Sequence, residues 1–177
     1  MVTGNPAIGA SHQKATNTVD AGYSALKLFL EDEQHLTTLR RIKLVLAFEG
    51  ISDKSTRLVD EIAETSEQAL DDLEKLAAAK PAIVFKEFSD DSIGKATFDS
   101  LRIATAKELL LETDDFEKDL LLSQSNILRV ISHLAIQLEE KETNAKRKAW
   151  LSKLAVRYEK YYQQVYAQIS IRGKGRA

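Results

Sequence analysis

The chain has 177 residues, of which 44% are hydrophobic and 29% are charged, and its formal net charge is −2. This length and composition fit one globular domain and exclude a disordered chain. The near-neutral charge gives no electrostatic case for a nucleic acid or an anionic membrane as partner. Because cysteine is absent, disulfides, thiol nucleophiles and cysteine-based zinc sites are excluded, whereas cytoplasm and periplasm both stay open.

The start of the chain has no apolar run that could serve as the core of a signal peptide. We expect residues 1–14 to be a flexible leader, either native or the exposed start of a processed chain. A single helical-bundle domain is expected over 15–171, and a basic flexible tail over 172–177. A membrane-spanning helix needs about 20 apolar residues in a row. No such run occurs, so no membrane span is expected.

Apolar residues recur at helical spacing along most of the chain, with few glycines and prolines between them. The first helix is expected over about 18–48, with Gly50 as its stop signal. A second helix follows closely, with Ser52 or Asp53 as its N-cap and Pro81 after its end. The short connection predicts an antiparallel hairpin.

After the second helix the helical period is lost, and residues 81–95 are expected to form an extended crossover. A third, shorter helix is expected over about 96–112. The acids of TDDFEKD, residues 113–119, predict the cap and first turn of a fourth helix that reaches about residue 141. Alternatively, the third and fourth helices are one kinked helix. With a fifth helix after KETNAKRK, the sequence predicts an all-α, up-and-down bundle of four long helices and one shorter helix.

The segment EDEQHL in the first helix combines three acids with a histidine. If Ala25 and Phe29 mark the inward seam, Asp32 is the acid whose register turns it inward, three residues before His35. Three readings stay open: a solvated acidic face, a buried hydrogen bond between Asp32 and His35, and half of a metal site. Because runs of charge are usually exposed, we expect the solvated face.

A carboxylate and an imidazole together suit iron, manganese or zinc. Only Glu108, on the third helix, is a further acid at an inward position. The candidate metal ligands are therefore Asp32, His35 and Glu108. The other helical histidine, His133, groups with polar residues on its helix and is expected to face solvent.

EDEQHL and the following RLVDEIAETSEQALDDLEKLAAAKP resemble uncharacterised bacterial ferritin-like bundle proteins over residues 18–80. The resemblance implies a ferritin-like topology, with a crossover where PAIVFKEFSDDS stands. Of the metal ligands of such bundles, only Asp32, His35 and Glu108 could match. His133 lacks an acid three residues before it, so the second acid–histidine motif is missing.

Two tyrosines of the last helix, Tyr162 and Tyr166, fall off its apolar stripe. We take them as candidate interface residues, because exposed tyrosines are common at protein interfaces. The basic cluster Lys146, Arg147 and Lys148 is interpreted as part of a solvated face.

The sequence contains no nucleophile elbow, phosphate loop, dinucleotide-binding glycine motif or zinc-protease motif. We therefore expect a non-enzymatic helical-bundle protein that acts through protein interaction or self-association. The alternative is a ferritin-like protein that binds iron or manganese at a degenerate carboxylate–histidine site. A third reading is a lipid or small apolar ligand held between splayed helices.

Overall fold

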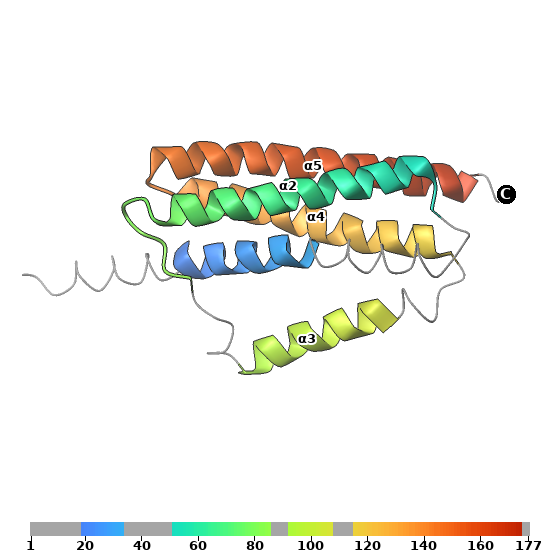
Figure 1. Cartoon of the computed structure of the whole chain (residues 1–177), viewed down its shortest axis with the longest axis horizontal. Coiled ribbons are helices and arrows are strands. Elements are labelled where there is room, and N and C mark those ends of the chain that lie inside the picture. Colours follow the sequence, from blue (N-terminus) through green and yellow to red (C-terminus); the bar gives the residue numbers. More distant parts are fainter. Residues whose placement is uncertain (1–18, 34–50, 86–91, 108–114, 175–177) are drawn as a thin grey trace, which may run out of the picture.

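The computed structural model of the protein describes residues 19–33, 51–85, 92–107 and 115–174, and within these ranges it contains helices and no strands. The helices are a segment at 19–33, α2 (Asp53–Ala77), α3 (Ser92–Lys107), α4 (Phe116–Lys141) and α5 (Ala145–Lys174) (Figure 1). The prediction of an all-α protein is confirmed. Over the described ranges, none of these helices combines the length and the apolar content that crossing a membrane requires.

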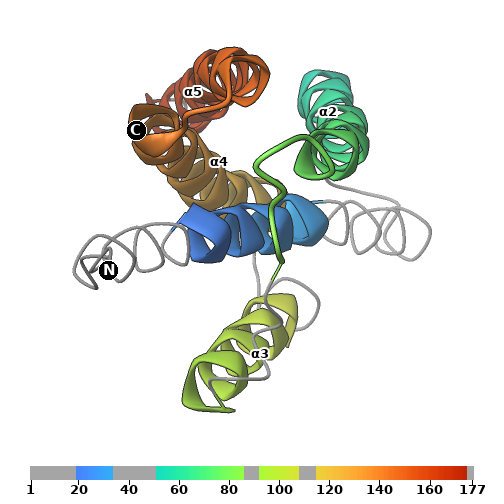
Figure 2. The ribbon, with the colours of Figure 1, turned by 90° about the vertical axis from the view of Figure 1, so that its left-hand side faces the viewer.

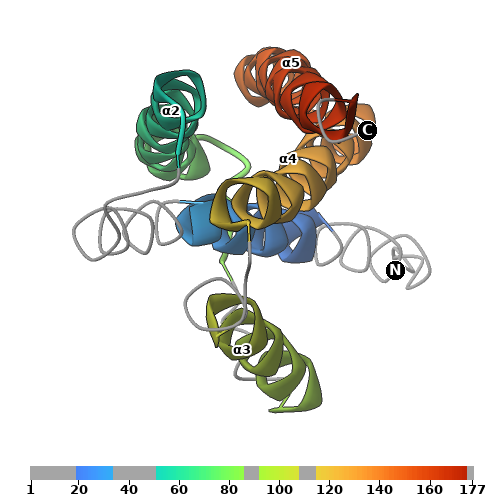
Figure 3. The ribbon, with the colours of Figure 1, turned by 90° about the vertical axis from the view of Figure 1, so that its right-hand side faces the viewer.

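Four of the helices surround a common core, and α3 lies outside it. Figures 2 and 3 show the 19–33 helix, α2, α4 and α5 grouped together, with α3 on the far side of the 19–33 helix. In Figure 1, α2 and α4 run in one direction, whereas the 19–33 helix and α5 run in the other. The second helix therefore returns antiparallel to the first, as predicted, although the 19–33 helix crosses the bundle obliquely (Figure 2).

Local sequence signals set the ends of the long helices. Ser52 is the N-cap of α2, and its side chain accepts a hydrogen bond from a backbone N–H of the first turn. Asp115 caps α4 in the same way, as the acidic segment predicts. The side chain of Asn144 accepts two backbone hydrogen bonds at the start of α5. Each cap satisfies N–H groups that have no partner inside the helix.

The crossover is shorter than the sequence predicts. Residues 82–85 are neither helix nor strand, but α3 begins at Ser92 rather than near residue 96. Gly94, which favours a loop in the sequence, lies in the first turn of α3, where few intrahelical hydrogen bonds depend on it. Residues 108–114 lie outside the described part of the chain, and so does the predicted junction between the third and fourth helices.

The core is built from the apolar stripes that the sequence predicts on α2, α4 and α5. Gly22 lets the 19–33 helix approach α4 closely, because a Cβ at Gly22 would lie 2.7 Å from Cδ2 of Leu138. The largest completely buried apolar side chains are Leu26, Leu30, Ile62, Leu73, Leu120, Leu121, Leu128, Ile131 and Leu151. The bundle thus holds four helices around a mainly apolar centre, into which a few polar groups also point.

Candidate functional site

The three acids of EDEQHL have three different surroundings. Glu31 is partly exposed and forms an ion pair with Lys27, with Nζ and Oε1 2.7 Å apart. Asp32 is 9% exposed, and its Oδ1 lies 2.8 Å from Nε of Arg102 on α3. Glu33 is completely buried. The prediction of a solvated acidic face is therefore wrong for Asp32 and Glu33.

The inward seam of this helix differs by one position from the expected one. Ala25 and Phe29 are only partly buried. The buried seam, in steps of three and four residues, consists of Tyr23, Leu26, Leu30 and Glu33. Asp32 consequently lies beside the seam and is paired with α3, and Glu33 is the acid that enters the core. His35 and Glu108, the other two candidate metal ligands, lie outside the described residues.

Each of the four bundle helices buries a polar side chain completely: Glu33, Ser66, Gln124 and Tyr158 all have 0% exposure. The hydroxyls of Ser66 and Tyr158 lie 2.7 Å apart. Ser66 also donates to the carbonyl of Ile62 at 2.9 Å, so Tyr158 is the donor of the pair. Within the described ranges, the Glu33 carboxylate and the Gln124 amide have no hydrogen-bond partner. Such groups are costly to bury.

The environment of Glu33 favours its protonated form. Burial raises the pKa of Glu33 well above its ordinary value, and the neighbouring charge of Asp32 raises it further. Burial also raises the pKa of the Tyr158 hydroxyl, and the Glu33 carboxylate contributes to that rise. Burial therefore favours the uncharged forms of both Glu33 and Tyr158 inside the bundle.

Arg147 corrects the interpretation of the basic cluster, because it is 2% exposed whereas its two lysine neighbours are exposed. Its Nε lies 2.8 Å from Oε2 of Glu142, and its guanidinium also donates to the carbonyl of Ala79 at 2.9 Å. The Tyr23 hydroxyl donates to the same carboxylate. Burial would raise the pKa of Glu142, but the hydrogen bonds from Arg147 and Tyr23 outweigh it and lower that pKa. This cluster ties the α4–α5 connection to the end of α2 and to the 19–33 helix.

A second buried cluster lies at the opposite end of the bundle. Glu117, 2% exposed on α4, accepts hydrogen bonds from the Ser52 hydroxyl at 2.8 Å and from the Ser55 hydroxyl at 2.6 Å. Gln168 of α5 lies 2.6 Å from the same Ser55 hydroxyl. Because the carboxylate stands at the N-terminus of α2, it also interacts favourably with the helix dipole. Each end of the bundle thus contains a buried polar cluster that joins helices to one another.

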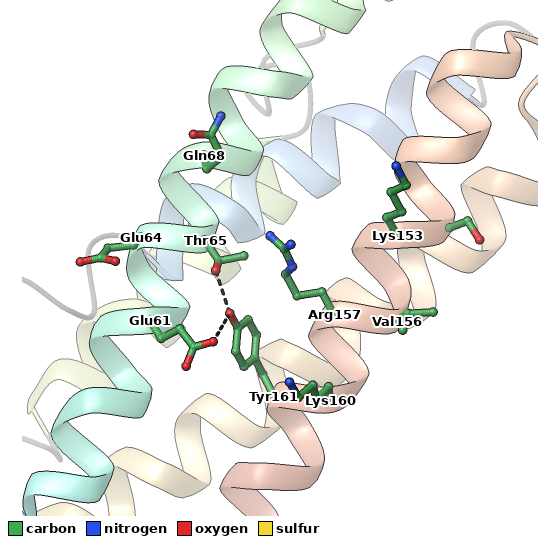
Figure 4. A pocket seen from close by; sticks show the side chains of 10 residues that line it. Glu61, Glu64, Thr65, Gln68, Lys153, Val156, Arg157, Lys160 and Tyr161 are labelled. Carbon is green, nitrogen blue, oxygen red and sulfur yellow. Dashed lines mark hydrogen bonds between the residues drawn. The ribbon is translucent and has the colours of Figure 1, made fainter.

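A groove runs along the seam between α2 and α5. Its central hollow has a volume of about 760 Å³. The central hollow is lined by Glu61, Glu64, Thr65 and Gln68 of α2 and by Ser152, Lys153, Val156, Arg157, Lys160 and Tyr161 of α5 (Figure 4). A hollow of about 120 Å³ continues it towards Asp72 and Trp150, and one of about 360 Å³ continues it towards Lys54 and Gln168. The groove therefore follows most of the length of α2.

Hydrogen bonds between the two helices form the floor of the groove. Oγ1 of Thr65 lies 2.8 Å from the hydroxyl of Tyr161, which donates to Oε1 of Glu61 at 3.1 Å (Figure 4). The Tyr161 proton is used by Glu61, so Thr65 donates to Tyr161. Burial is the main cause that raises the pKa of Tyr161, and its proton is retained.

The two walls of the groove carry opposite charge. Glu61 and Glu64 project from α2, and Lys153, Arg157 and Lys160 project from α5 (Figure 4). Across the part of the chain that the structure describes, none of these three cations forms a hydrogen bond or an ion pair. Because no ion pair among the described residues joins these cations to Glu61 or Glu64, the two walls suit a partner with charges of both signs.

The groove is the feature that sequence reasoning missed. The sequence does contain its two components, because Glu61 and Glu64 flank the apolar stripe of α2, and Lys153, Arg157 and Lys160 recur every three or four residues on α5. That these two charged rows face each other across a hollow depends on the spacing of the helices, for which a single sequence contains no signal.

The predicted interface tyrosines lie on another face of α5. Tyr162 is half-buried, and Tyr166 is 54% exposed. Their ring centroids are 6.0 Å apart, and the guanidinium of Arg129 on α4 lies 5.7 Å from the Tyr162 ring centroid. Tyr162 is thus already engaged by α4, and Tyr166 is the freer of the two rings. His133, also on α4, is exposed as predicted.

In the described ranges, no group of three or more histidines, aspartates and glutamates is arranged to hold a metal ion. Comparison of the chain with protein-family models, with curated proteins and with solved structures gives no match. The geometry of the site is therefore the basis for a functional proposal.

Proposed function

We propose that this chain is a non-enzymatic helical-bundle protein that acts by binding another protein chain in the groove between α2 and α5. The observation that carries the proposal is the pairing of an acidic and a basic wall, neither neutralised by the other, along a continuous hollow. Grooves between helices are a recurring place for helical segments of partner proteins. Exposed charges of both signs add specificity and speed to such binding.

The polar centre of the bundle supports the same proposal indirectly. Ser66 and Tyr158 satisfy each other, and the ends of the bundle are closed by the Glu142–Arg147 and Ser55–Glu117 clusters. These polar groups therefore contribute to the architecture. Glu64, Lys153, Arg157 and Lys160 form no hydrogen bond or ion pair among the described residues, so these groove charges are available for recognition.

The test is quantitative capture from extracts of the source cells with Arg157→Glu beside the wild type. Arg157→Glu makes the basic wall discontinuous, so we expect it to retain at most about a tenth of the partner chain. Lys118→Glu is the matched control, because Lys118 is exposed on α4 and outside the groove. A wild type that retains no chain and stays monomeric at every concentration would contradict the proposal, as would equal capture by both variants.

A second candidate, a ferritin-like metal-binding protein, is favoured by two observations. The directions of the four bundle helices, with a long connection between α2 and α4, match the single crossover of ferritin-like bundles (Figure 1). Among the described residues, the buried Glu33 carboxylate has no hydrogen-bond partner. Metal analysis of protein produced with added iron and manganese tests this function. Less than about 0.2 metal ions per chain would contradict it, because a specific carboxylate–imidazole site should be substantially filled.

A further inference from the structure

The two charged walls of the groove are arranged as parallel strips at matching heights. The acidic strip consists of Glu61, Glu64 and Asp72 on α2, and the basic strip consists of Lys153, Arg157 and Lys160 on α5. Because the helices are antiparallel, residue numbers rise along one strip and fall along the other (Figure 1).

Two hydrogen bonds between α2 and α5 show which residues of the two helices lie at the same position along the groove. Ser66 meets Tyr158 at 2.7 Å, and Thr65 meets Tyr161 at 2.8 Å. Moving from the Ser66–Tyr158 pair by two residues along each helix places Glu64 level with Lys160. Moving by six residues in the opposite direction places Asp72 level with Ser152, the neighbour of Lys153, and Asp72 and Lys153 line the same hollow.

We propose that the chain that occupies this face is a second copy of the same protein, related by a two-fold axis parallel to α2 and α5. This inference rests on the proposed function of the groove. A rotation of 180° about this axis keeps every residue at the same position along the axis. It places α2 of one copy opposite α5 of the other. The acidic strip of one copy then faces the basic strip of the other, and the reverse contact follows by symmetry. Because Glu64 matches Lys160 and Asp72 matches Lys153 in height within one chain, these pairs also match between two copies.

Residues beside the strips agree with this arrangement. Val156, in the middle of the basic strip, is 71% exposed and offers apolar surface to the partner. Further along the groove the cations Lys54 and Arg57 of α2 lie opposite Gln164 and Ala167 of α5, which are uncharged. Among the residues that line this hollow, the two-fold arrangement therefore places the cations of α2 opposite uncharged residues of α5. An axis perpendicular to the helices would instead place acid against acid, which is unfavourable.

Sedimentation of the wild type and of two charge-reversal variants tests the proposal. One variant is Glu61→Lys with Glu64→Lys, and the other is Lys153→Glu with Lys160→Glu. Each variant alone places like charges opposite each other, so we expect the dimer dissociation constant to rise at least about tenfold. An equimolar mixture of the two should dimerise again, because each altered strip then faces its complement. Circular dichroism establishes that both variants fold, and Lys118→Glu should dimerise like the wild type.

Salt and cross-linking provide independent readouts. Raising the salt from about 0.1 M to about 1 M shortens the Debye length to about 3 Å and should weaken the wild-type dimer at least about tenfold. Since the chain has no cysteine, introduced thiols can be read without background. A short bismaleimide should link Glu64→Cys in one copy to Lys160→Cys in another, and should not link two copies of Glu64→Cys.

Several outcomes would overturn the inference. They are a wild type that is monomeric at all concentrations, a mixture of the two charge-reversal variants that stays monomeric although the wild type dimerises, and efficient linkage between two Glu64→Cys copies. A monomer that nevertheless captures a different chain, in a manner that Arg157→Glu abolishes, would refute the second copy as occupant and leave the proposed function standing. A monomer that captures nothing would refute both.

Discussion

At the scale of single residues, Glu33 is the side chain whose burial is least compensated. Its carboxylate has no partner within the described ranges, and burial raises its pKa. Glu33→Leu replaces it with an apolar group of similar size, and we expect the free energy of unfolding at pH 7 to rise by about 1–3 kcal/mol. Chemical denaturation measures this change. Glu31→Leu, at the exposed neighbour, should shift stability by about 0.5 kcal/mol or less.

Glu33 should also make the stability of the folded protein depend on pH. Because the pKa of Glu33 is higher in the folded than in the unfolded chain, the folded state binds more protons. Stability should therefore fall as pH rises above the unfolded value of 4.5, until the folded pKa is passed. Glu33→Leu should remove this decline. A variant that is less stable than the wild type would show that Glu33 has a partner, such as a bound ion, and would favour the metal-binding candidate.

For Arg147 we expect the opposite effect on the free energy of unfolding, because its buried guanidinium has hydrogen-bond partners. Arg147→Met leaves the Glu142 carboxylate buried without its cation and leaves the carbonyl of Ala79 without a donor. We expect a loss of about 3–5 kcal/mol at neutral pH, measured by denaturation. The pKa of Glu142 is lowered in the folded state, so this contribution exists above pH 4.5 and disappears as pH falls through the folded pKa. Lys148→Met, at an exposed neighbour, should be nearly neutral, and a similar cost for both variants would contradict the assignment.

The residue scale is where sequence reasoning succeeds least. The burial of Asp32, Glu33 and Arg147 depends on which helix lies opposite, and charged residues are exposed in most proteins. A shift of the seam by one position places Glu33 in the core, whereas Asp32 lies beside the seam and is paired with Arg102. Only the neighbouring helix could reveal that shift.

At the scale of elements, the sequence left Ser52 and Asp53 open as caps of α2, and the structure selects Ser52. The Ser52 hydroxyl accepts from the backbone of Ser55 and donates to Glu117. We expect Ser52→Ala to destabilise the protein by about 1–2 kcal/mol. Asp53→Ala should cost about 0.5 kcal/mol, because only its interaction with the helix dipole is lost. Thermal denaturation of the two variants decides between them, and a larger loss for Asp53→Ala would reverse the assignment.

Helix positions are predicted well because their determinants are local. The cap at Asp115, the stop before Pro81 and the stripe from Leu151 to Val165 all depend on residues within a few positions of one another. The start of α3 is predicted less well, because a glycine at residue 94 is compatible with a loop and with a first helical turn.

At the scale of the whole molecule, the arrangement of α3 is the feature that no local signal specifies. α3 lies outside the bundle, and its Leu101 and Ile103 are 61% and 70% exposed. An ion pair between Arg102 and Asp32 joins it to the 19–33 helix. No described side chain of α3 belongs to the core, so α3 should open more readily than the helices that surround the core.

Hydrogen exchange measured along the chain tests whether α3 opens more readily than the helices that surround the core. We expect amides of α3 to exchange at least about a hundredfold faster than those in the middle of α4 and α5, where opening requires disruption of the core. Arg102→Leu removes the ion pair and should speed exchange in α3 further. It should change global stability by about 1 kcal/mol or less, because Arg102 is partly exposed and such pairs contribute little. Equal protection of α3 and α4 would mean that α3 is held by a surface beyond that ion pair. In that case Arg102→Leu would leave the exchange rates of α3 unchanged. If the ion pair is the main contact, the same variant should raise these rates.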